Sequence, residues 1–214
     1  LAGRGTEPAV DDATRVDRVA APDSAVSPTT RNVPRAASAD AHPSTDAAAV
    51  VSTTALRKVY GDHAALDGVD LQVPTGSVFG LVGPNGAGKT TLLAILAGLR
   101  RASAGTVALG VPPSKVALLP DTPQFDPWLT ASEVVELSRG LVAPHLDPQR
   151  SRDALAVAGL ADVADRRTGG FSRGMLQRLG VAATIVGEPE LLLLDEPCSA
   201  LDPLGRRDML DLIG

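Results

Sequence analysis

The sequence predicts an α/β fold organised around a phosphate-binding loop, and three consecutive features lead to that prediction. Residues 78–82 form a short, nearly continuous apolar run, which is typical of a strand buried on both faces. GPNGAGKT at residues 83–90 follows directly and matches the pattern G-x-x-x-x-G-K-[ST]. An almost entirely apolar, helix-like segment then covers residues 92–99. Strand, glycine-rich loop and helix in this order indicate a nucleoside triphosphate site.

The loop supplies the phosphate contacts that we expect at this site. Its glycines let backbone N–H groups curl around phosphate oxygens, and the helix N-terminus adds partial positive charge. Lys89 is expected to reach the β- and γ-phosphates, and the Thr90 hydroxyl is expected to ligate Mg²⁺. The alternative is a glycine-rich turn that binds nothing, but the flanking strand and helix argue against it. The predicted nucleotide-binding residues of the loop are Gly83, Pro84, Asn85, Gly86, Ala87, Gly88, Lys89, Thr90 and Thr91.

Composition narrows the class of protein. The 214 residues allow one domain, or one domain with a tail. A formal net charge of −5, with no block rich in Lys and Arg, gives no electrostatic case for binding nucleic acid. One cysteine, Cys198, excludes an intrachain disulfide, and we expect it to have a packing role. No apolar run approaches the roughly 18 residues of a membrane span. We therefore expect a soluble, cytoplasmic protein, unless partners hold it at a membrane.

Two regions of different amino-acid composition precede the loop. Residues 1–52 are rich in Ala, Pro, Ser, Thr, Asp and Arg and lack Phe, Tyr, Trp, Ile and Met, so they predict a disordered tail. Whether that tail is merely solvated or acts as a regulatory or tethering arm stays open. Residues 53–59 and 66–73 alternate enough to be strands, joined by a turn at Gly61 and Asp62.

The chain after the loop predicts a helical insertion in the α/β domain. Gly98 is expected to end the loop helix, and residues 105–109 and 116–119 are the next predicted strands. Thr130-Ala131-Ser132-Glu133 reads as a capping box that begins a helix running to about Gly140. A second helix is expected between Asp147-Pro148 and Gly159, and a third from Ser172 to Val186. We place the helical subdomain at about residues 121–171.

Two acidic residues follow a second apolar run. Leucines fill residues 191–194, and Asp195, Glu196 and Pro197 come directly after them. Carboxylates at the end of a buried strand are costly unless a cation compensates them, and ligands of open α/β sheets bind at the carboxyl ends of strands. We therefore expect Asp195 to help hold Mg²⁺ and Glu196 to polarise the attacking water. The alternative is a carboxylate pair that caps a turn before Pro197. Asp202-Pro203 predicts the start of a further helix.

The order of four motifs resembles that of ATP-binding cassette (ABC) ATPases, the engines of ABC transporters. The motifs are GPNGAGKT at 83–90, FSRGM at 171–175, LLLLDEP at 191–197 and SALD at 199–202. The resemblance covers residues 53–214. It implies a P-loop NTPase with a RecA-like core, a β-subdomain and an inserted helical subdomain, and it implies ATP with Mg²⁺ as the ligands. A small GTPase would carry an N-K-x-D guanine motif, which the sequence lacks.

The resemblance extends to single residues. Tyr60 falls where the family stacks an aromatic ring on adenine, although a ring packed in the core is the competing interpretation. Asp121 falls where the family usually has a Gln that reaches the metal and the attacking water, so we expect Asp121 near the metal. Gln124 lies close by in sequence and is an alternative for that role.

The FSRGM segment departs from the family's LSGGQ signature. Ser172 and Gly174 are kept, whereas Arg173 and Met175 replace Gly and Gln, a form that resembles the ATPases of ABC-2-type exporters. In the family this signature completes the site of a second subunit, which implies two ATP molecules between two head-to-tail chains. Ser172 can serve there and cap its helix as well. Asp202 is expected to communicate across that interface.

The resemblance therefore implies an ATP-hydrolysing subunit, with Lys89 and Glu196 as its catalytic residues, that drives a membrane-spanning permease in export. Phe125, Trp128 and Leu129 are candidate contacts to that permease, or packing residues of the subdomain. The family also places a His beyond SALD, and the sequence ends at Gly214 before that point, so we expect a domain incomplete at its C-terminus. The alternative function is an ATP-binding module without turnover.

Overall fold

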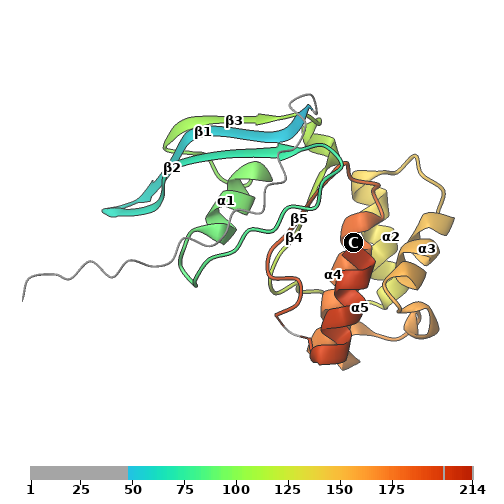
Figure 1. Cartoon of the computed structure of the whole chain (residues 1–214). Coiled ribbons are helices and arrows are strands. Elements are labelled where there is room, and N and C mark those ends of the chain that lie inside the picture. Colours follow the sequence, from blue (N-terminus) through green and yellow to red (C-terminus); the bar gives the residue numbers. More distant parts are fainter. Residues whose placement is uncertain (1–47, 200, 214) are drawn as a thin grey trace, which may run out of the picture. The chain divides into compact units, whose positions relative to one another are not determined.

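The computed structural model describes residues 48–199 and 201–213 (Figure 1). The tail predicted at residues 1–52 therefore lies outside the described residues up to position 47. Its predicted boundary is wrong, because strand β1 begins at Ala49. Val50 and Val51 are 7% and 2% exposed and join the core. Two adjacent buried valines thus place this stretch in the sheet.

β1 (Ala49–Tyr60) is the middle strand of an antiparallel sheet, with β2 (His63–Pro74) on one side and β3 (Ala104–Leu109) on the other. The strands predicted at 53–59, 66–73 and 105–109 are confirmed, and each extends beyond the predicted range. The predicted turn at Gly61 and Asp62 joins β1 to β2. Gly61 has a φ of +55°, a left-handed conformation that glycine adopts without steric cost.

β4 (Val116–Leu119) and β5 (Leu191–Leu194) pair in parallel, so both predicted strands are confirmed. The pairing runs residue by residue from Val116 opposite Leu191 to Leu119 opposite Leu194. Because parallel strands end at the same edge, the segments that follow Leu119 and Leu194 leave the sheet side by side. The short 3₁₀ turn η1 (Pro113–Lys115) leads into β4.

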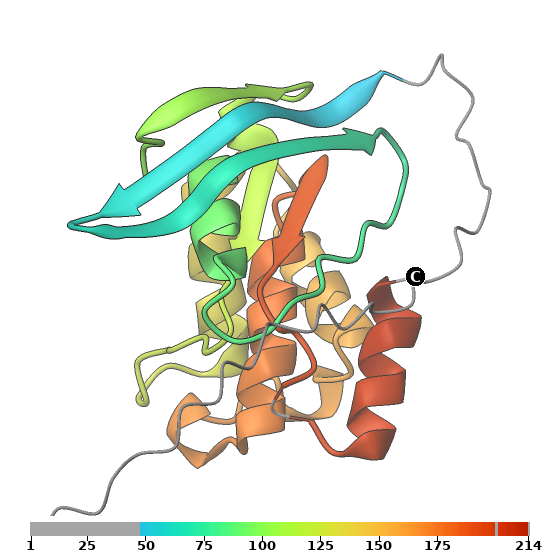
Figure 2. The ribbon, with the colours of Figure 1, turned by 60° about the vertical axis from the view of Figure 1, so that its left-hand side comes forward.

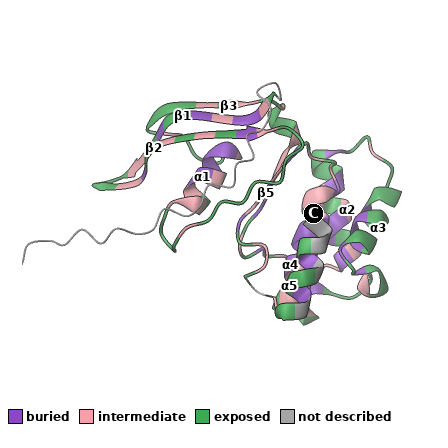
Figure 3. Ribbon diagram, viewed as in Figure 1, coloured by how far each residue is buried: buried purple, intermediate pink, exposed green. Residues whose placement is uncertain are grey.

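The strand predicted at residues 78–82 is wrong, because this segment has no regular secondary structure. Val78, Phe79, Leu81 and Val82 are exposed, Val82 to 94%, and Figure 3 shows the segment in the exposed colour between β2 and α1. An apolar run becomes a buried strand only where a neighbouring strand accepts its hydrogen bonds. Among the described residues, β4 and β5 pair with each other and with no third strand.

α1 (Lys89–Leu96) begins at the end of the glycine-rich loop and packs against the antiparallel sheet (Figures 1 and 2). Its buried residues Leu92, Ile95 and Leu96 share one core cluster with residues of β1, β2 and β5. Gly98 lies just past the helix with a φ of +73°, and its N–H donates to the Ile95 carbonyl. The predicted glycine stop of this helix is confirmed.

Helices α2 (Ala131–Val142), α3 (Gln149–Val157) and α4 (Arg173–Ile185) bury a second core cluster between them. Two 3₁₀ turns, η2 (Ala161–Val163) and η3 (Thr168–Gly170), connect α3 to α4. The predicted capping box of α2 is confirmed, because Thr130 and Glu133 exchange both of its hydrogen bonds. The Thr130 N–H that donates to Glu133 also lowers the pKa of that carboxyl. α5 (Pro203–Ile213) follows β5, as the Asp202-Pro203 pair predicts.

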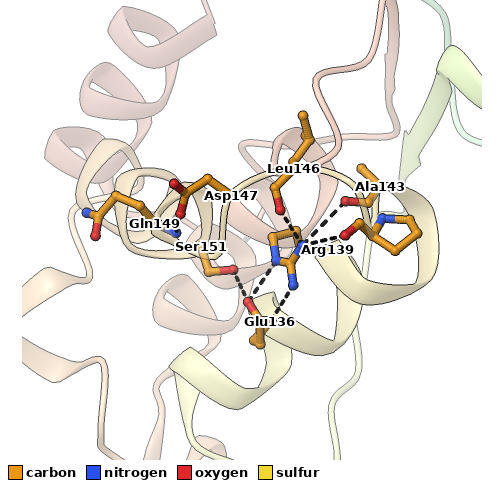
Figure 4. A network of polar contacts seen from close by, with 8 residues as sticks. Glu136, Arg139, Ala143, Leu146, Asp147, Gln149 and Ser151 are labelled. Atoms are coloured by element: carbon orange, nitrogen blue, oxygen red, sulfur yellow. Dashed lines mark hydrogen bonds and ion pairs between the residues drawn. The ribbon is translucent and has the colours of Figure 1, made fainter.

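A polar network ties the end of α2 to the start of α3 (Figure 4). The Arg139 guanidinium, only 10% exposed, pairs with Glu136 and donates to the Leu146 carbonyl at 2.6 Å. Ser151 of α3 donates to the same Glu136 carboxylate at 2.7 Å. These hydrogen bonds, that of Arg139 first, lower the pKa of Glu136 to about 2. The network therefore joins the α2–α3 connection to both helices, in addition to the apolar core that the helices share.

Candidate nucleotide-binding and catalytic site

Most of the predicted site residues line one pocket of about 490 Å³, although they come from separate segments of the chain. The pocket brings the glycine-rich loop together with the end of β1, the start of β2 and the residues that follow β4 and β5. A second cavity, of about 410 Å³, lies between β4 and α4 and has no charged side chain in its lining. The residues lining the first pocket are Tyr60, His63, Ala65, Asn85, Gly86, Gly88, Lys89, Thr90, Thr91, Asp121, Asp195 and Glu196.

The loop takes a conformation that requires glycine at two positions. Gly86 and Gly88 have φ values of +82° and +86°. A Cβ at Gly88 would also overlap the carbonyl oxygen of Ala65 on β2, so the loop lies directly against the strand. Gly88 caps α1 without a side-chain hydrogen bond, which leaves the first N–H groups of the helix free for an anion. Gly83, Pro84 and Ala87 belong to this loop but do not line the pocket.

Lys89 connects the loop to the carboxylates. Its ammonium donates to the carbonyl oxygens of Gly83 at 2.9 Å and Pro84 at 3.1 Å. It also lies 3.6 Å from Glu196 Oε1 and is only 16% exposed. A largely buried ammonium between the loop and a carboxylate is already in position to meet a phosphate group.

Asp195 and Glu196 follow β5 and differ in environment. Asp195 is 6% exposed, and its backbone N–H donates to the Leu119 carbonyl at the end of β4. The Glu196 side chain is 44% exposed, and its φ of +48° is uncommon for a residue with a Cβ. The Ser199 N–H donates to the Glu196 carbonyl at 3.0 Å and closes a turn over residues 196–199. Glu196 is thus held in a costly backbone conformation at the mouth of the pocket.

Asp195 and Thr90 both line the pocket, and a carboxylate and a hydroxyl are oxygen ligands of the kind that hard divalent cations prefer. The described part of the chain contains no group of three or more His, Cys, Asp or Glu side chains arranged to hold a metal by themselves. A cation here would therefore take part of its coordination from phosphate oxygens and water, as Mg²⁺ commonly does.

Asp121 lies in the loop after β4 and also lines the pocket, half-buried. Its Oδ1 accepts a hydrogen bond from the Ser199 hydroxyl at 2.6 Å, and its Oδ2 lies 3.3 Å from the Thr122 hydroxyl. Gln124, the sequence alternative, is exposed and lines the second cavity instead. Of the two, Asp121 is the residue that faces the nucleotide pocket.

Tyr60 is 40% exposed at the end of β1, so its ring is not packed in the core. The Lys58 ammonium lies 5.0 Å and the Arg100 guanidinium 5.7 Å from the ring centroid, both within cation–π range. Lys58 also donates to the Arg101 carbonyl at 2.7 Å, which fixes the end of β1 to the segment after α1. These contacts hold an aromatic face at the rim of the pocket.

His63 and Ala65 line the pocket although the sequence analysis did not single them out. His63 pairs with Tyr60 across the β1–β2 turn, and Ala65 lies against Gly88. The turn at Gly61 and Asp62 is the signal that could have found His63, because a tight hairpin places the residues on its two sides together.

The pocket that contains the glycine-rich loop is not lined by Ser172, Gly174 or Asp202. Ser172 caps α4 by accepting from the Met175 N–H at 3.2 Å, and Asp202 accepts from the Gly205 N–H at 2.8 Å. Within one chain the structure thus separates these predicted site residues from the loop and the carboxylates. Of the candidate permease contacts, Phe125 and Leu129 pack on the helical core, whereas Trp128 is 63% exposed.

Comparison with known proteins places this loop and these carboxylates in a family. The model of the ABC transporter family matches residues 66–199. An uncharacterized ABC transporter ATP-binding protein of Nostoc sp. is 42% identical over 182 residues, which cover 77% of this chain and 54% of that protein. The aliphatic sulfonates import ATP-binding protein SsuB 1 of Mesorhizobium japonicum is 40% identical, over 74% of this chain and 61% of its own length. The chain belongs to the ABC transporter family.

A solved structure has the same fold. It is an ATP-binding cassette in a dimeric, post-hydrolysis state bound to ADP and Pi, with a TM-score of 0.69 and 25% identity. The match covers 76% of this chain and 81% of that one. The fold is therefore that of ABC ATPase domains, a P-loop NTPase fold. The chain spans between half and two thirds of the length of the curated relatives it matches. In the part that the structure describes, no helix combines the length and apolarity that crossing a membrane requires.

Proposed function

We propose that this chain is the ATP-binding subunit of an ABC transporter and hydrolyses ATP to drive a membrane-spanning permease. The observation that carries the proposal is the meeting of Lys89 with Asp195 and Glu196 in one pocket, with the Lys89 ammonium 3.6 Å from Glu196 Oε1. A phosphate-binding lysine and a carboxylate able to accept a proton are the two groups that phosphoryl transfer to water requires.

ATP binding rests on the loop and on Tyr60. The backbone N–H groups of residues 83–91 and the N-terminus of α1 would hold the phosphates, and Lys89 would turn from the Gly83 and Pro84 carbonyls to the β- and γ-phosphates. Tyr60 would stack on the adenine, since its ring lines the pocket and is 40% exposed.

Thr90 and Asp195 would hold Mg²⁺ next to the phosphates. When bound, that ion neutralises negative charge that develops on the phosphate oxygens. Glu196, which is exposed at the pocket mouth, would orient the attacking water and accept its proton. Binding of the phosphates would draw Lys89 away from Glu196, which frees the carboxylate for this role.

The partners belong to the same proposal. Ser172, Gly174 and Asp202 would complete the pocket of a second chain in a head-to-tail dimer, a role supported by their position outside their own chain's pocket. The permease would hold the subunit at the cytoplasmic face of the membrane, with Trp128 exposed toward it. For the direction of transport we propose export by an ABC-2-type system, on the Ser172–Met175 form of the signature, although relatives of similar identity are named for import and for export.

Hydrolysis of Mg-ATP by the purified chain, measured across a series of protein concentrations, tests the proposal. We expect phosphate release per chain to rise with protein concentration, because each composite site needs two chains. ATP binding without phosphate release at any concentration would refute the proposed turnover and favour the alternative of a binding module. Release per chain that is independent of concentration would refute the dimeric site.

A further inference from the structure

A side-chain hydrogen bond connects the loops that follow the two parallel strands. The Ser199 hydroxyl, after β5, donates to Asp121 Oδ1, after β4, at 2.6 Å. The partners are 78 residues apart in sequence. They meet because β4 and β5 are in register to their last residues, Leu119 and Leu194, and the Asp195 N–H still donates to the Leu119 carbonyl. The contact therefore lies just beyond the carboxyl ends of the paired strands.

Ser199 is also the residue that closes the turn carrying Glu196. Its N–H donates to the Glu196 carbonyl at 3.0 Å, so one residue is bonded to Glu196 through its backbone and to Asp121 through its side chain. Glu196 has a φ of +48°, which a residue with a Cβ adopts only where surrounding contacts impose it. The Asp121–Ser199 hydrogen bond is a contact of that kind.

Glu196 has a second restraint, its ion pair with Lys89 at 3.6 Å. A bound triphosphate competes for the Lys89 ammonium, since a phosphate carries more charge than one carboxylate. Once Lys89 turns to the phosphates, the direction of the Glu196 side chain depends on the backbone of its turn. The restraint from Asp121 thus acts at the stage when the water must be oriented.

We propose that Asp121 is a positioning residue, which holds the Glu196–Ser199 turn through the Ser199 hydroxyl and so aims Glu196 into the pocket. The proposal rests on the proposed role of Glu196 as the base. In this proposal Asp121 orients the turn, whereas the sequence alone suggests that Asp121 binds the metal. Its Oδ1 is engaged by Ser199, and its Oδ2 faces the Thr122 hydroxyl.

Four variants of the full chain test the proposal by steady-state ATP hydrolysis. Asp121→Ala and Ser199→Ala should each lower kcat by roughly 10-fold to 10²-fold, the effect of misplacing a catalytic group by about 1 Å, with little change in ATP affinity. The kcat of the double variant should be no lower than that of the less active single variant, because both substitutions remove the same contact. Thr122→Val is the matched control, since it removes the other hydroxyl near Asp121 and should retain the wild-type kcat.

Asp121→Asn separates positioning from metal binding. The Asn carbonyl oxygen can still accept from Ser199, so this variant should recover most of the kcat that Asp121→Ala loses. A kcat as low as that of Asp121→Ala, with a raised Mg²⁺ requirement, would overturn the proposal in favour of a metal ligand. Independent, additive losses for Asp121→Ala and Ser199→Ala would also overturn it.

Hydrogen–deuterium exchange of the backbone amides in residues 195–199 gives a readout that needs no hydrolysis. Exchange at Ser199 should accelerate in Asp121→Ala and Ser199→Ala and stay at the wild-type rate in Thr122→Val, because only the first two release the turn. Unchanged exchange in Asp121→Ala would overturn the proposal even if the wild-type chain hydrolyses ATP. If exchange accelerates in Asp121→Ala and Ser199→Ala but the wild-type chain does not hydrolyse ATP, the proposed function is refuted and the restraint itself is established.

Discussion

At the scale of single residues, the proposed hydrolysis depends on Glu196, whose side chain would exist in two situations. With Lys89 beside it, the carboxylate is paired with the ammonium at 3.6 Å. With Lys89 engaged by phosphate, it would become the unpaired, partly exposed base that the proposed mechanism requires. Nucleotide binding would therefore replace the ion pair between Glu196 and Lys89 with a contact between Glu196 and the attacking water.

Glu196→Gln tests this role. The amide keeps the size of the side chain but cannot accept the proton of the attacking water, so we expect hydrolysis to fall by roughly 10²–10⁴-fold. ATP affinity should not fall, because the amide no longer competes with phosphate for Lys89. Phosphate release and binding of a fluorescent ATP analogue measure the two effects separately. Equal losses of affinity and turnover would contradict the role of Glu196 as the base.

The sequence predicts those site residues that lie in, or directly after, one continuous motif. Lys89 and Thr90 belong to one motif, and Asp195 and Glu196 follow one apolar run, so local order alone points to them. His63 reaches the pocket through the pairing of β1 with β2, and Ser199 reaches Asp121 across 78 residues. Such contacts arise from strand register, which a motif does not encode.

At the scale of elements, the same distinction separates the confirmed predictions from the wrong ones. Thr130 and Glu133 satisfy each other's backbone N–H groups locally, so α2 could be placed from four residues. Gly98 ends α1 for an equally local reason, its left-handed backbone. The apolar residues 78–82 needed a partner strand to become β-structure, and a hydrophobic pattern does not show whether one is present.

The network between α2 and α3 predicts a dependence of stability on pH. Glu136 has a pKa of about 2 in the folded chain against an ordinary value of 4.5, so the folded state binds its proton more weakly than the unfolded state does. Its contribution is present above pH 4.5 and is lost progressively as the pH falls toward 2. Solvent screening at the half-exposed Glu136 keeps the effect small.

Glu136→Gln isolates this contribution. At pH 7 the variant should unfold at a lower temperature than the wild type, because Arg139 and Ser151 lose a charged acceptor. The difference in unfolding midpoint should shrink between pH 5 and pH 3, as measured by circular dichroism. Glu188→Gln, which removes an exposed ion pair with Arg150, is the control for a lost carboxylate outside the network. A difference that stays constant with pH would contradict the assigned pKa shift.

At the scale of the whole molecule, the separation of Ser172, Gly174 and Asp202 from the pocket has a consequence for assembly. A chain that carries the loop and carboxylates in one place and a capped helix N-terminus in another can supply two different halves of a site. Two chains related by a two-fold axis could then form two complete sites with the same pair of surfaces. Mixing variants with defects in different halves tests this arrangement directly.

Lys89→Ala removes the phosphate lysine, whereas Ser172→Asp keeps the cap of α4 but brings a negative charge to the surface expected to face phosphate. Each variant alone should be close to inactive. A one-to-one mixture should recover about one quarter of the wild-type rate, because half of the dimers are mixed and one of the two sites in each is intact. The control mixes Lys89→Ala with Glu196→Gln. Both of these defects lie in the same half, so no mixed dimer has an intact site and no activity should return. Recovery in the control, or none in the first mixture, would show that hydrolysis does not use a site shared between chains.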